Sequence, residues 1–580
     1  MTSPMQCSGT EPGQRQLAGI QTTGREYRNL SSPEFGIAVE HSVPVPMRDG
    51  VKLRADVYRP DGSGRFPALV AMSPYPRQMQ GFGIPAGFVE AGQSDFFVPR
   101  GYAHVIANSR GTCGSEGTYD FWGPNEKTDL YDLIEWVAAQ PWCDGEVGMI
   151  GVSYFAIEQY RAALQKPPHL RAIFPFSGST DFYREAFWHG GMLCGRFIAR
   201  FFAGIGMLSR KTDRFFRSPA FDVLNRILHT PRIHRRLAAP HKDTLKVFEL
   251  ALRFPYDTHP WDDIFYQVAV EHQLYDDYWR YRDLSRRLGD IKIPMYLGAD
   301  WENVSLHLDT PFAVFDTLDK SIPYRVSITP RGSLQWPWES LHVEALAWYD
   351  HWLKRRDTGI MEGAAIRYYV EGADEWRTAE SWPLPQTQFT DWHLRTDGVL
   401  SAEPGPQGAR DYLHMPKAMD LPKNANPPHL PAALWWDTAP FGRAVELVGP
   451  FKLSLHAAST APDADWIVKL QMIDGAGGVS DLTQGWLRGS RRALDPARST
   501  PYRPYHPHDR SEPLVPGEPT WFEIAIVPTA QRFKPGERLR LLLTSADEGI
   551  AMQGLSHVTV GLQARNSIFG DSRLMVPIVA

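Results

Sequence analysis

One stretch of the sequence, residues 147–164, limits the fold more than any other. It begins with the apolar run Val147-Gly148-Met149-Ile150 and passes through Gly151 to Ser153. Apolar residues then recur at helical spacing from Ala156 to Leu164, which predicts a helix. A strand that turns sharply into a helix at a serine is a nucleophile elbow, in which the serine is strained and its hydroxyl is exposed above the sheet. The stretch therefore predicts both a buried strand and a candidate nucleophile.

Short apolar runs alternate with helical patterns on both sides of this elbow. The hairpin pattern of residues 43–58 is followed by apolar runs that suit buried parallel strands; these runs are residues 68–72, 104–107, 172–176 and 293–298. Residues 126–139 and 339–354 carry apolar side chains at helical spacing. Strands that alternate with helices predict an α/β fold with a doubly wound sheet.

The chain has 580 residues, which is too long for one hydrophobic core. We expect a flexible N-terminal extension, an α/β core in two segments, an inserted helical cap with helices at 197–207 and 244–253, and a C-terminal β-sandwich. The predicted boundaries are 1–35 for the extension, 36–180 and 289–362 for the core, 181–288 for the cap and 363–580 for the β-sandwich.

The composition argues against several classes of partner. With a net charge of −5, the chain has no excess of cations to neutralise phosphates, so we expect neither a nucleic-acid partner nor a membrane partner. The four cysteines show no metal-like or disulfide-like spacing, which favours reduced thiols. The first 34 residues lack the pattern of a secretion signal or a transit peptide. A cytoplasmic location is therefore predicted.

Several motifs resemble one family of serine hydrolases. The run from Gln140 to Tyr154 (QPWCDGEVGMIGVSY), the run from Arg110 to Gly117 (RGTCGSEG) and the later run WYDHWLK at 348–354 are similar to the cocaine-esterase and X-Pro dipeptidyl-peptidase (CocE/NonD) family. In the C-terminal part, the run GWLRGS at 485–490 resembles the jelly-roll domain of that family. The resemblance implies an α/β-hydrolase core with a helical cap, followed by an all-β jelly-roll domain.

The same resemblance assigns the nucleophile and the oxyanion hole. The family's nucleophile falls on Ser153, and its two oxyanion donors fall on the backbone N–H of Tyr154 and the phenol of Tyr75. Two donors aimed at one point stabilise the oxyanion of a tetrahedral intermediate, each by roughly 3 kcal/mol. Tyr75 directly follows the apolar run 68–72, which is where such a donor belongs.

The acid and the base depart from the family pattern. The family's acid lies two residues after a tryptophan, which puts Asn303 in its place, while Asp300 and Glu302 flank Trp301. We expect Asp300 to be the acid because it directly follows an apolar run, with Glu302 and Asn303 as alternatives.

At the position of the family's histidine stands Ser333. The nearest candidates for the general base are His342, at the start of a predicted helix, and His307, in the loop after Trp301. His342 is the leading expectation and His307 is the alternative.

These residues predict a serine hydrolase that cleaves an ester or amide bond of a small molecule or short peptide through an acyl-enzyme on Ser153. The altered acid and base positions keep two other functions open, because deacylation by water also needs a base. One is an acyltransferase or cyclising enzyme of small-molecule biosynthesis, and the other is a binding protein that has lost catalysis. This chemistry requires no metal and no organic cofactor, and the resemblance makes a homodimer plausible.

Overall fold

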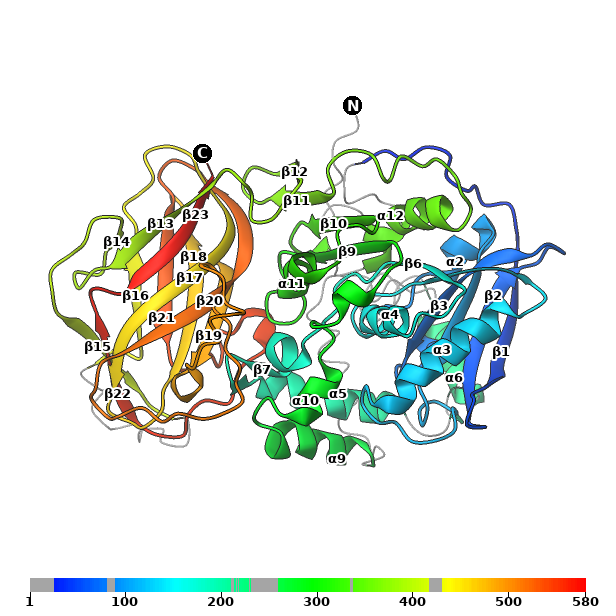
Figure 1. Ribbon diagram of the computed structural model, residues 1–580, viewed down its shortest axis with the longest axis horizontal. Coiled ribbons are helices and arrows are strands. Elements are labelled where there is room, and N and C mark those ends of the chain that lie inside the picture. The colour runs from blue at the N-terminus through cyan, green and yellow to red at the C-terminus, as the bar shows by residue number, and fades with distance from the viewer. Residues whose placement is uncertain are drawn as a thin grey trace.

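The computed structural model describes residues 25–579, except for residues 81–88, 210–212, 215, 217, 229, 231–258, 334–336 and 417–429. Two β-sheet units lie side by side, and helices surround the sheet of the N-terminal unit (Figure 1). The helix expected at 244–253 lies outside the described residues. So does most of the N-terminal extension expected at 1–35.

In the described part of the chain, the N-terminal unit is built on a ten-stranded sheet with the order β1-β2-β4-β3-β5-β6-β9-β10-β11-β12. The strands from β4 to β11 pair in parallel, whereas β1, β2 and β12 are antiparallel to their neighbours. Their bounds are β1 Ile37–Pro46, β2 Lys52–Pro60, β3 Phe66–Ser73, β4 Ala103–Asn108, β5 Cys143–Met149, β6 Leu170–Ile173, β9 Met295–Asp300, β10 Tyr324–Thr329, β11 Ile366–Val370 and β12 Glu375–Ala379.

Helices cover both faces of this sheet, and the side chains of β3 show why. Val70 belongs to a core that also holds Leu130 of α3, whereas Leu69 belongs to a second core with Leu341 of α12. Successive residues of a strand point to opposite faces, so a continuous apolar run is buried on both sides. The helices of this unit are α1 Arg77–Gln80, α2 Ser94–Phe97, α3 Pro124–Ala138, α4 Tyr154–Gln165, α11 Asp309–Thr317 and α12 Pro337–Trp352. The doubly wound α/β core predicted from the sequence is therefore present.

Between β6 and β9 the chain forms a cap of short helices and one two-stranded hairpin. The hairpin joins β7 Trp188–His189 to β8 Met192–Leu193. The described helices of the cap are α5 Gly195–Leu208, α6 Pro219–Leu228, α9 Trp261–Tyr266 and α10 Asp277–Arg282. In Figure 1, α5, α9 and α10 lie along the lower side of the molecule, next to the β unit.

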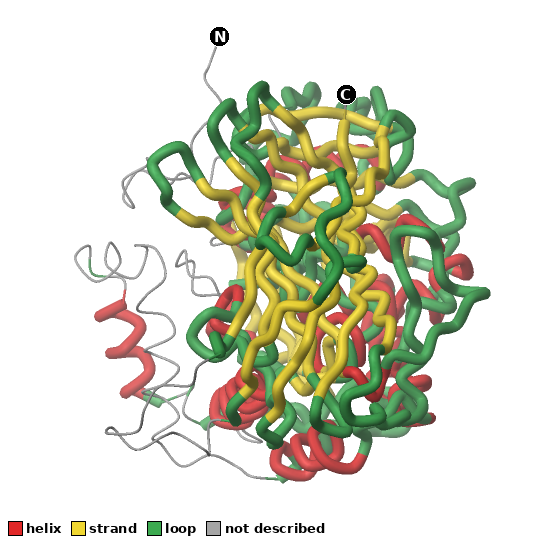
Figure 2. The backbone as a smooth tube through the Cα atoms, turned by 90° about the vertical axis from the view of Figure 1, so that its left-hand side faces the viewer, coloured by secondary structure: helices red, strands yellow, loops and turns green. Residues whose placement is uncertain are grey.

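The described residues of the C-terminal unit form eleven strands in one wrapped antiparallel sheet. Its strands fill the foreground of Figure 2. The bounds are β13 Thr387–Leu394, β14 Leu400–Ser401, β15 Ala409–His414, β16 Ala433–Asp437, β17 Val445–Ser459, β18 Asp465–Ile473, β19 Val479–Arg488, β20 Thr520–Phe533, β21 Arg538–Thr544, β22 Ala564–Phe569 and β23 Arg573–Val579. Its own core includes Leu453, Trp466 and Leu541. The β-rich second unit expected from the sequence is present.

The first sheet continues past the boundary expected at residue 363. β11 pairs in parallel with β10 through the register Val326 to Ile366, and β12 then adds an antiparallel edge. Both strands read as short alternating runs, so the sequence alone places them with the β-sandwich. Long-range pairing, rather than the local pattern, decides which sheet a short strand joins.

Candidate active site

Ser153 lies at the predicted elbow, between β5 and α4. Its backbone has φ 57° and ψ −121°, a conformation that costs of order 1–3 kcal/mol for a residue with a Cβ atom. The turn is held on both sides, because the Val152 N–H donates to the Glu90 carbonyl at 3.0 Å and the Ser153 N–H donates to the Phe176 carbonyl at 3.3 Å. The strained serine that the sequence predicts is therefore present.

Gly151 is required at this turn for two reasons. Its φ is 139°, and a Cβ atom added there would lie 2.1 Å from the Cβ atom of Phe155. Real Cβ atoms do not approach so closely, so any side chain at this position would push the first turn of α4 away from the strand. The close packing at Gly151 sets the direction in which α4 leaves the sheet.

The backbone N–H of Tyr154 is available at the first position of α4. At this position a helix has no carbonyl four residues earlier to accept the N–H, and the positive end of the helix dipole favours a developing anion. The side chain of Tyr154 points elsewhere, because its phenol donates to Glu126 Oε1 at 3.0 Å and lies 2.7 Å from the phenol oxygen of Tyr119. Tyr154 can therefore contribute only its backbone to an oxyanion hole.

Tyr75 follows the end of β3 and packs on the start of α4. Its ring centroid lies 5.7 Å from that of Tyr154 and 6.0 Å from that of Phe155. The backbone is fixed by hydrogen bonds from the Tyr75 N–H to Ser73 Oγ at 3.0 Å and from Asn108 Nδ2 to the Tyr75 carbonyl at 2.6 Å. Burial, with the Glu90 carboxyl nearby, raises the pKa of the Tyr75 phenol well above its usual value of 10. The phenol therefore keeps its proton and remains a donor.

Glu90 is a residue of this site that the sequence analysis missed. Its carbonyl holds the elbow through Val152, and its partly buried side chain influences Tyr75. Burial raises the pKa of the Glu90 carboxyl well above its usual range. The residue follows no recognisable motif, so only the fold could place it beside the elbow.

A second group of buried ionisable residues, Glu126, Glu158 and Arg161, lies between α3 and α4. Glu126 of α3 accepts from the Trp122 N–H at 2.6 Å and from the Tyr154 phenol, and burial raises its pKa to about 7. Glu158 of α4 lies 3.5 Å from Arg161 Nε, and burial raises the pKa of Glu158 well above its usual range. One arginine thus faces two buried carboxyls. The sequence places Glu158 and Arg161 three residues apart but gives no sign that both are buried.

The candidate acids lie at the carboxyl end of β9. Asp300 is buried, and its Oδ1 accepts the Asn303 N–H at 3.1 Å. The Asn303 carbonyl in turn accepts the His307 N–H at 3.1 Å, so Asp300 helps to fold the loop that carries His307. Glu302 is half-buried on the same loop and lies close enough to Arg331 to influence the pKa of that guanidinium.

The β unit clamps this loop. Gln553, in the loop after β21, donates from Nε2 to Asn303 Oδ1 at 2.9 Å and accepts the Ser305 N–H at Oε1 at 3.1 Å. Asn303 therefore binds the second unit of the protein. Among the described residues no hydrogen bond joins Asn303 to a histidine side chain.

His342 lies on α12 in an apolar environment. Its ring stacks on Phe96 with centroids 4.0 Å apart, and neither ring nitrogen has a hydrogen-bond partner within the described part of the chain. Burial lowers the pKa of His342 to about 3. The structure does not join His342 to Ser153 or to Asp300 by a hydrogen bond in the described residues.

His307 lies beside the strand ends that hold the elbow. Its Nδ1 is 2.9 Å from the Gly178 carbonyl, and Gly178 follows Phe176, whose carbonyl binds Ser153. Because a carbonyl only accepts, Nδ1 carries the proton and Nε2 offers its lone pair. Burial lowers the pKa of His307 to about 4, which keeps the ring neutral at neutral pH.

Ser333, which stands where the family has its histidine, lies in the turn after β10 and forms a hydrogen bond with the last residue of that strand. Its Oγ lies 2.5 Å from Thr329 Oγ1, and its carbonyl accepts from Ser340 Oγ at 2.6 Å. These contacts fix the start of the turn after β10. Residues 334–336 follow it and lie outside the described residues.

The doubly wound sheet and the strained serine between β5 and α4 define an α/β-hydrolase. Comparison with known proteins gives the family. Residues 49–332 match the model of the X-Pro dipeptidyl-peptidase (S15) family, and residues 358–573 match that of the X-Pro dipeptidyl-peptidase C-terminal non-catalytic domain. The chain belongs to the family of cocaine esterases and X-Pro dipeptidyl-peptidases (CocE/NonD), as its motifs predict.

Individual relatives agree over most of the chain. Cocaine esterase from Rhodococcus sp. (strain MB1 Bresler) is 29% identical over 555 residues, which cover 88% of this chain and 91% of the relative. A putative serine esterase from Mycobacterium bovis is 26% identical, covering 87% of this chain and 90% of the relative. The crystal structure of a CocE/NonD family hydrolase from Staphylococcus aureus superposes with a TM-score of 0.73 at 24% identity, covering 94% of each chain.

No helix among the described residues is long and apolar enough to cross a bilayer.

The position of Tyr75 makes a prediction about turnover. Tyr75→Phe removes one oxyanion donor and leaves the ring packing in place, so kcat for an activated aryl ester should fall about 100-fold with little change in KM. The matched control is Tyr119→Phe, which removes a buried phenol from the cluster around Tyr154 and should leave kcat within a few-fold of the wild type. Equal activity of Tyr75→Phe and the wild type would remove Tyr75 from the oxyanion hole.

The buried carboxyls predict a pH dependence of stability. Because the folded-state pKa of Glu158 is raised, the folded chain retains a proton that the unfolded chain releases above about pH 4.5, and stability falls as the pH rises through this window. Glu158→Gln should flatten that fall above about pH 4.5, by up to about 1.4 kcal/mol per pH unit. Urea unfolding at each pH measures the difference, with the exposed Glu34→Gln as control. Parallel profiles for the wild type and Glu158→Gln would contradict the assignment.

Proposed function

We propose that this chain is a serine hydrolase that cleaves an ester or amide bond of a small molecule or short peptide through an acyl-enzyme on Ser153. The observation that carries the proposal is the strained Ser153 at the elbow, with the Tyr154 N–H and the Tyr75 phenol beside it. Serine esterases and X-Pro dipeptidyl-peptidases among its relatives support the same class of reaction.

In the acylation step, Ser153 Oγ attacks the carbonyl carbon of the substrate as its proton passes to a general base. The negative charge that develops on the carbonyl oxygen is stabilised by the Tyr154 N–H and by the Tyr75 phenol. The base then gives the proton to the leaving alcohol or amine, and water repeats the sequence to release the acid. No metal or organic cofactor takes part in these steps.

His307 is our candidate for the base, and its surroundings support the choice over His342. The Gly178 carbonyl sets its tautomer, and Gly178 itself packs on α4, because a Cβ atom added there would lie 3.3 Å from the Cβ atom of Ala156. Leu306, the preceding residue, packs against the aromatic cluster that contains Tyr154. The imidazole is thus held within the structure that surrounds the nucleophile.

Asp300 is proposed as a positioning residue. It acts through the loop, since it binds the Asn303 N–H and Asn303 binds the His307 N–H. In this arrangement a backbone carbonyl, rather than a carboxylate, orients the imidazole. A carbonyl stabilises the imidazolium less than a carboxylate does, which is consistent with the low pKa of His307.

The nucleophile is tested with a fluorophosphonate probe, followed by intact mass and peptide mapping. We expect one adduct on Ser153 and none in Ser153→Ala. The matched control is Ser177→Ala, because Ser177, like Ser153, has a positive φ, here 51°, but is buried and lies outside the elbow; this variant should label like the wild type. A folded protein without any adduct would favour the binding function over catalysis.

The base is tested by comparing two histidine variants. His307→Gln should lower kcat at least 100-fold, whereas His342→Leu should leave kcat unchanged and preserve stability, because both nitrogens of His342 are unpartnered in an apolar site. The reverse result would assign the base to His342.

The pH profile gives a second measure of the base. A base with a pKa of about 4 is unprotonated across neutral pH, so kcat/KM should stay level on acidification and fall only as the pH approaches 4. A fall centred near 6.5, the usual pKa of histidine, would argue against His307.

A further inference from the structure

The β7–β8 hairpin of the cap is joined to the β unit by backbone hydrogen bonds on both of its sides. The Arg488 N–H, at the end of β19, donates to the Gly190 carbonyl at 2.8 Å, and the Val558 N–H donates to the Leu193 carbonyl at 2.8 Å. These bonds bring His189 of β7 and Cys194, the residue after β8, against the loop that carries His557. His189 and Cys194 flank β8 of the same hairpin, whereas His557 lies 368 residues after His189 in the sequence.

The two histidines face one another in an arrangement that favours a cation between them. His189 Nδ1 and His557 Nε2 lie 2.8 Å apart. The other nitrogen of each ring is committed as a donor, since His189 Nε2 lies 3.2 Å from the Glu185 carbonyl and His557 Nδ1 lies 2.8 Å from Asp547 Oδ2. With both protons placed there, two bare lone pairs point at each other. A proton or a metal ion between them removes the repulsion.

Cys194 adds a third ligand atom at the same point. Its Sγ, His189 Nδ1 and His557 Nε2 all lie within 4.8 Å of one another, and all three residues are buried. Sulfur and imidazole nitrogen together are the donor set preferred by borderline and soft d¹⁰ ions, above all Zn²⁺. A proton shared by two histidines has no need of the thiol.

We propose that His189, Cys194 and His557 form a Zn²⁺ site that joins the cap to the β unit.

The groups around these ligands fit a metal site. His557 donates to the Asp547 carboxylate, and His189 donates to a backbone carbonyl, which are the two outer contacts that orient metal-binding histidines. The indole of Trp486 stacks on His189 with centroids 4.6 Å apart and fixes its plane. Two nitrogens on one tetrahedral Zn²⁺ lie about 3.3 Å apart, so the rings need to separate by only roughly 0.5 Å.

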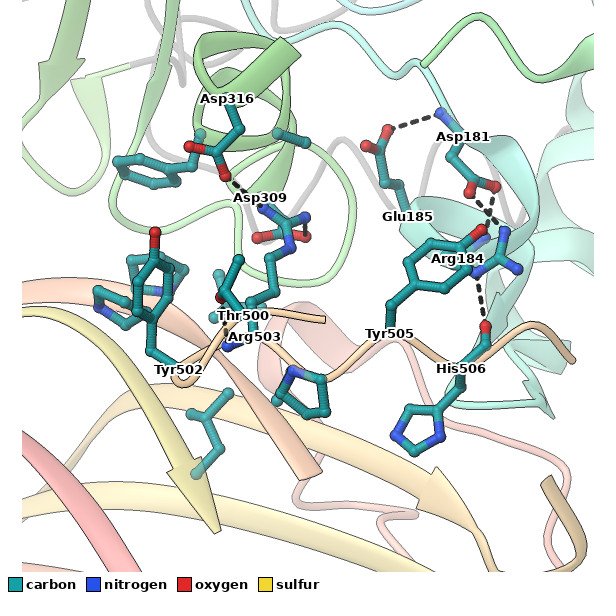
Figure 3. A pocket seen from close by; sticks show the side chains of 18 of the residues that line it. Asp181, Arg184, Glu185, Asp309, Asp316, Thr500, Tyr502, Arg503, Tyr505 and His506 are labelled. Carbon is teal, nitrogen blue, oxygen red and sulfur yellow. Dashed lines mark hydrogen bonds and ion pairs between the residues drawn. The ribbon is translucent and has the colours of Figure 1, made fainter. Parts of the chain in front are cut away.

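An ion can reach the site from a neighbouring cavity. This cavity of about 590 Å³ lies between the cap, α11 and the β unit, and His189 is one of its lining residues. Figure 3 shows Arg184 paired with Asp181, and Arg503 near Asp309 and Asp316. Because its charges are largely paired with one another, the cavity offers a polar route without a competing cluster of free carboxylates. Water from the cavity, or the Leu555 carbonyl at 3.7 Å from Cys194 Sγ, can supply a fourth ligand.

The test uses the full chain, stripped with a chelator and titrated with Co²⁺ in place of Zn²⁺. We expect one equivalent to bind with a thiolate-to-cobalt charge-transfer band, and Zn²⁺ to displace it. Cys194→Ser should abolish the band. Cys143→Ser, at a buried thiol of the α/β core, and Cys7→Ser should keep it. Asp547→Asn should weaken Zn²⁺ binding about 10- to 100-fold, because it loses the charge behind His557.

A second measurement needs no variant. Crystals of the wild-type protein with Zn²⁺ should give an anomalous peak at the zinc edge among the three ligand atoms. The proposal is overturned if no thiolate band forms at saturating Co²⁺, since a shared proton then satisfies the histidines. It is also overturned if the band survives in Cys194→Ser, or if the anomalous peak is absent from this position.

Discussion

The backbone conformation of Ser153 is the constraint on which the rest of the site depends. A residue with φ 57° and ψ −121° is unfavourable on its own, so neighbouring elements must hold it. Two hydrogen bonds do so, one from Val152 to Glu90 and one from Ser153 to Phe176. Phe176 follows β6, the strand beside β5, and pairs with Val152, whereas Glu90 lies in the segment between α1 and α2, so the elbow depends on elements other than its own strand and helix. The same two contacts bring Glu90 and the strand end at Phe176 next to the nucleophile.

Much of the fold could be predicted because its strands and helices have recognisable local sequence patterns. The continuous apolar run of β3, the stripe of α3 and the Gly151-Val152-Ser153 turn each carry a pattern whose period matches the observed element. Tyr75 could be predicted for the same reason, since its place at the end of β3 follows from the strand alone. The short strands β11 and β12 could not be assigned to a sheet, because β11 joins the first sheet by pairing with β10, and β12 joins it by pairing with β11.

The candidates for the acid and the base could not be ranked from the sequence, because contacts with residues distant in the chain determine the surroundings of each one. His342 has a sequence position close to the family's histidine, yet packing on Phe96 turns it into the core. His307 gains its tautomer from the carbonyl of Gly178, which is 129 residues away. Asn303 stands at the family's acid position and binds Gln553 of the β unit. None of these partners lies near the residue concerned in the sequence. Motif spacing therefore identifies candidate residues but does not show what each of them contacts in the fold.

The clamp by Gln553 has a consequence for the order in which the protein becomes functional. The loop of residues 303–308 is made well before its clamp, because Gln553, which binds Asn303 and Ser305, follows Asn303 by 250 residues in the sequence. Domains fold largely in the order in which they leave the ribosome, so the hydrolase sheet can form long before this loop is fixed. The nascent chain can therefore hold a formed elbow beside a loop that still lacks its clamp, and the site is completed only after the second unit has been made and has folded against it.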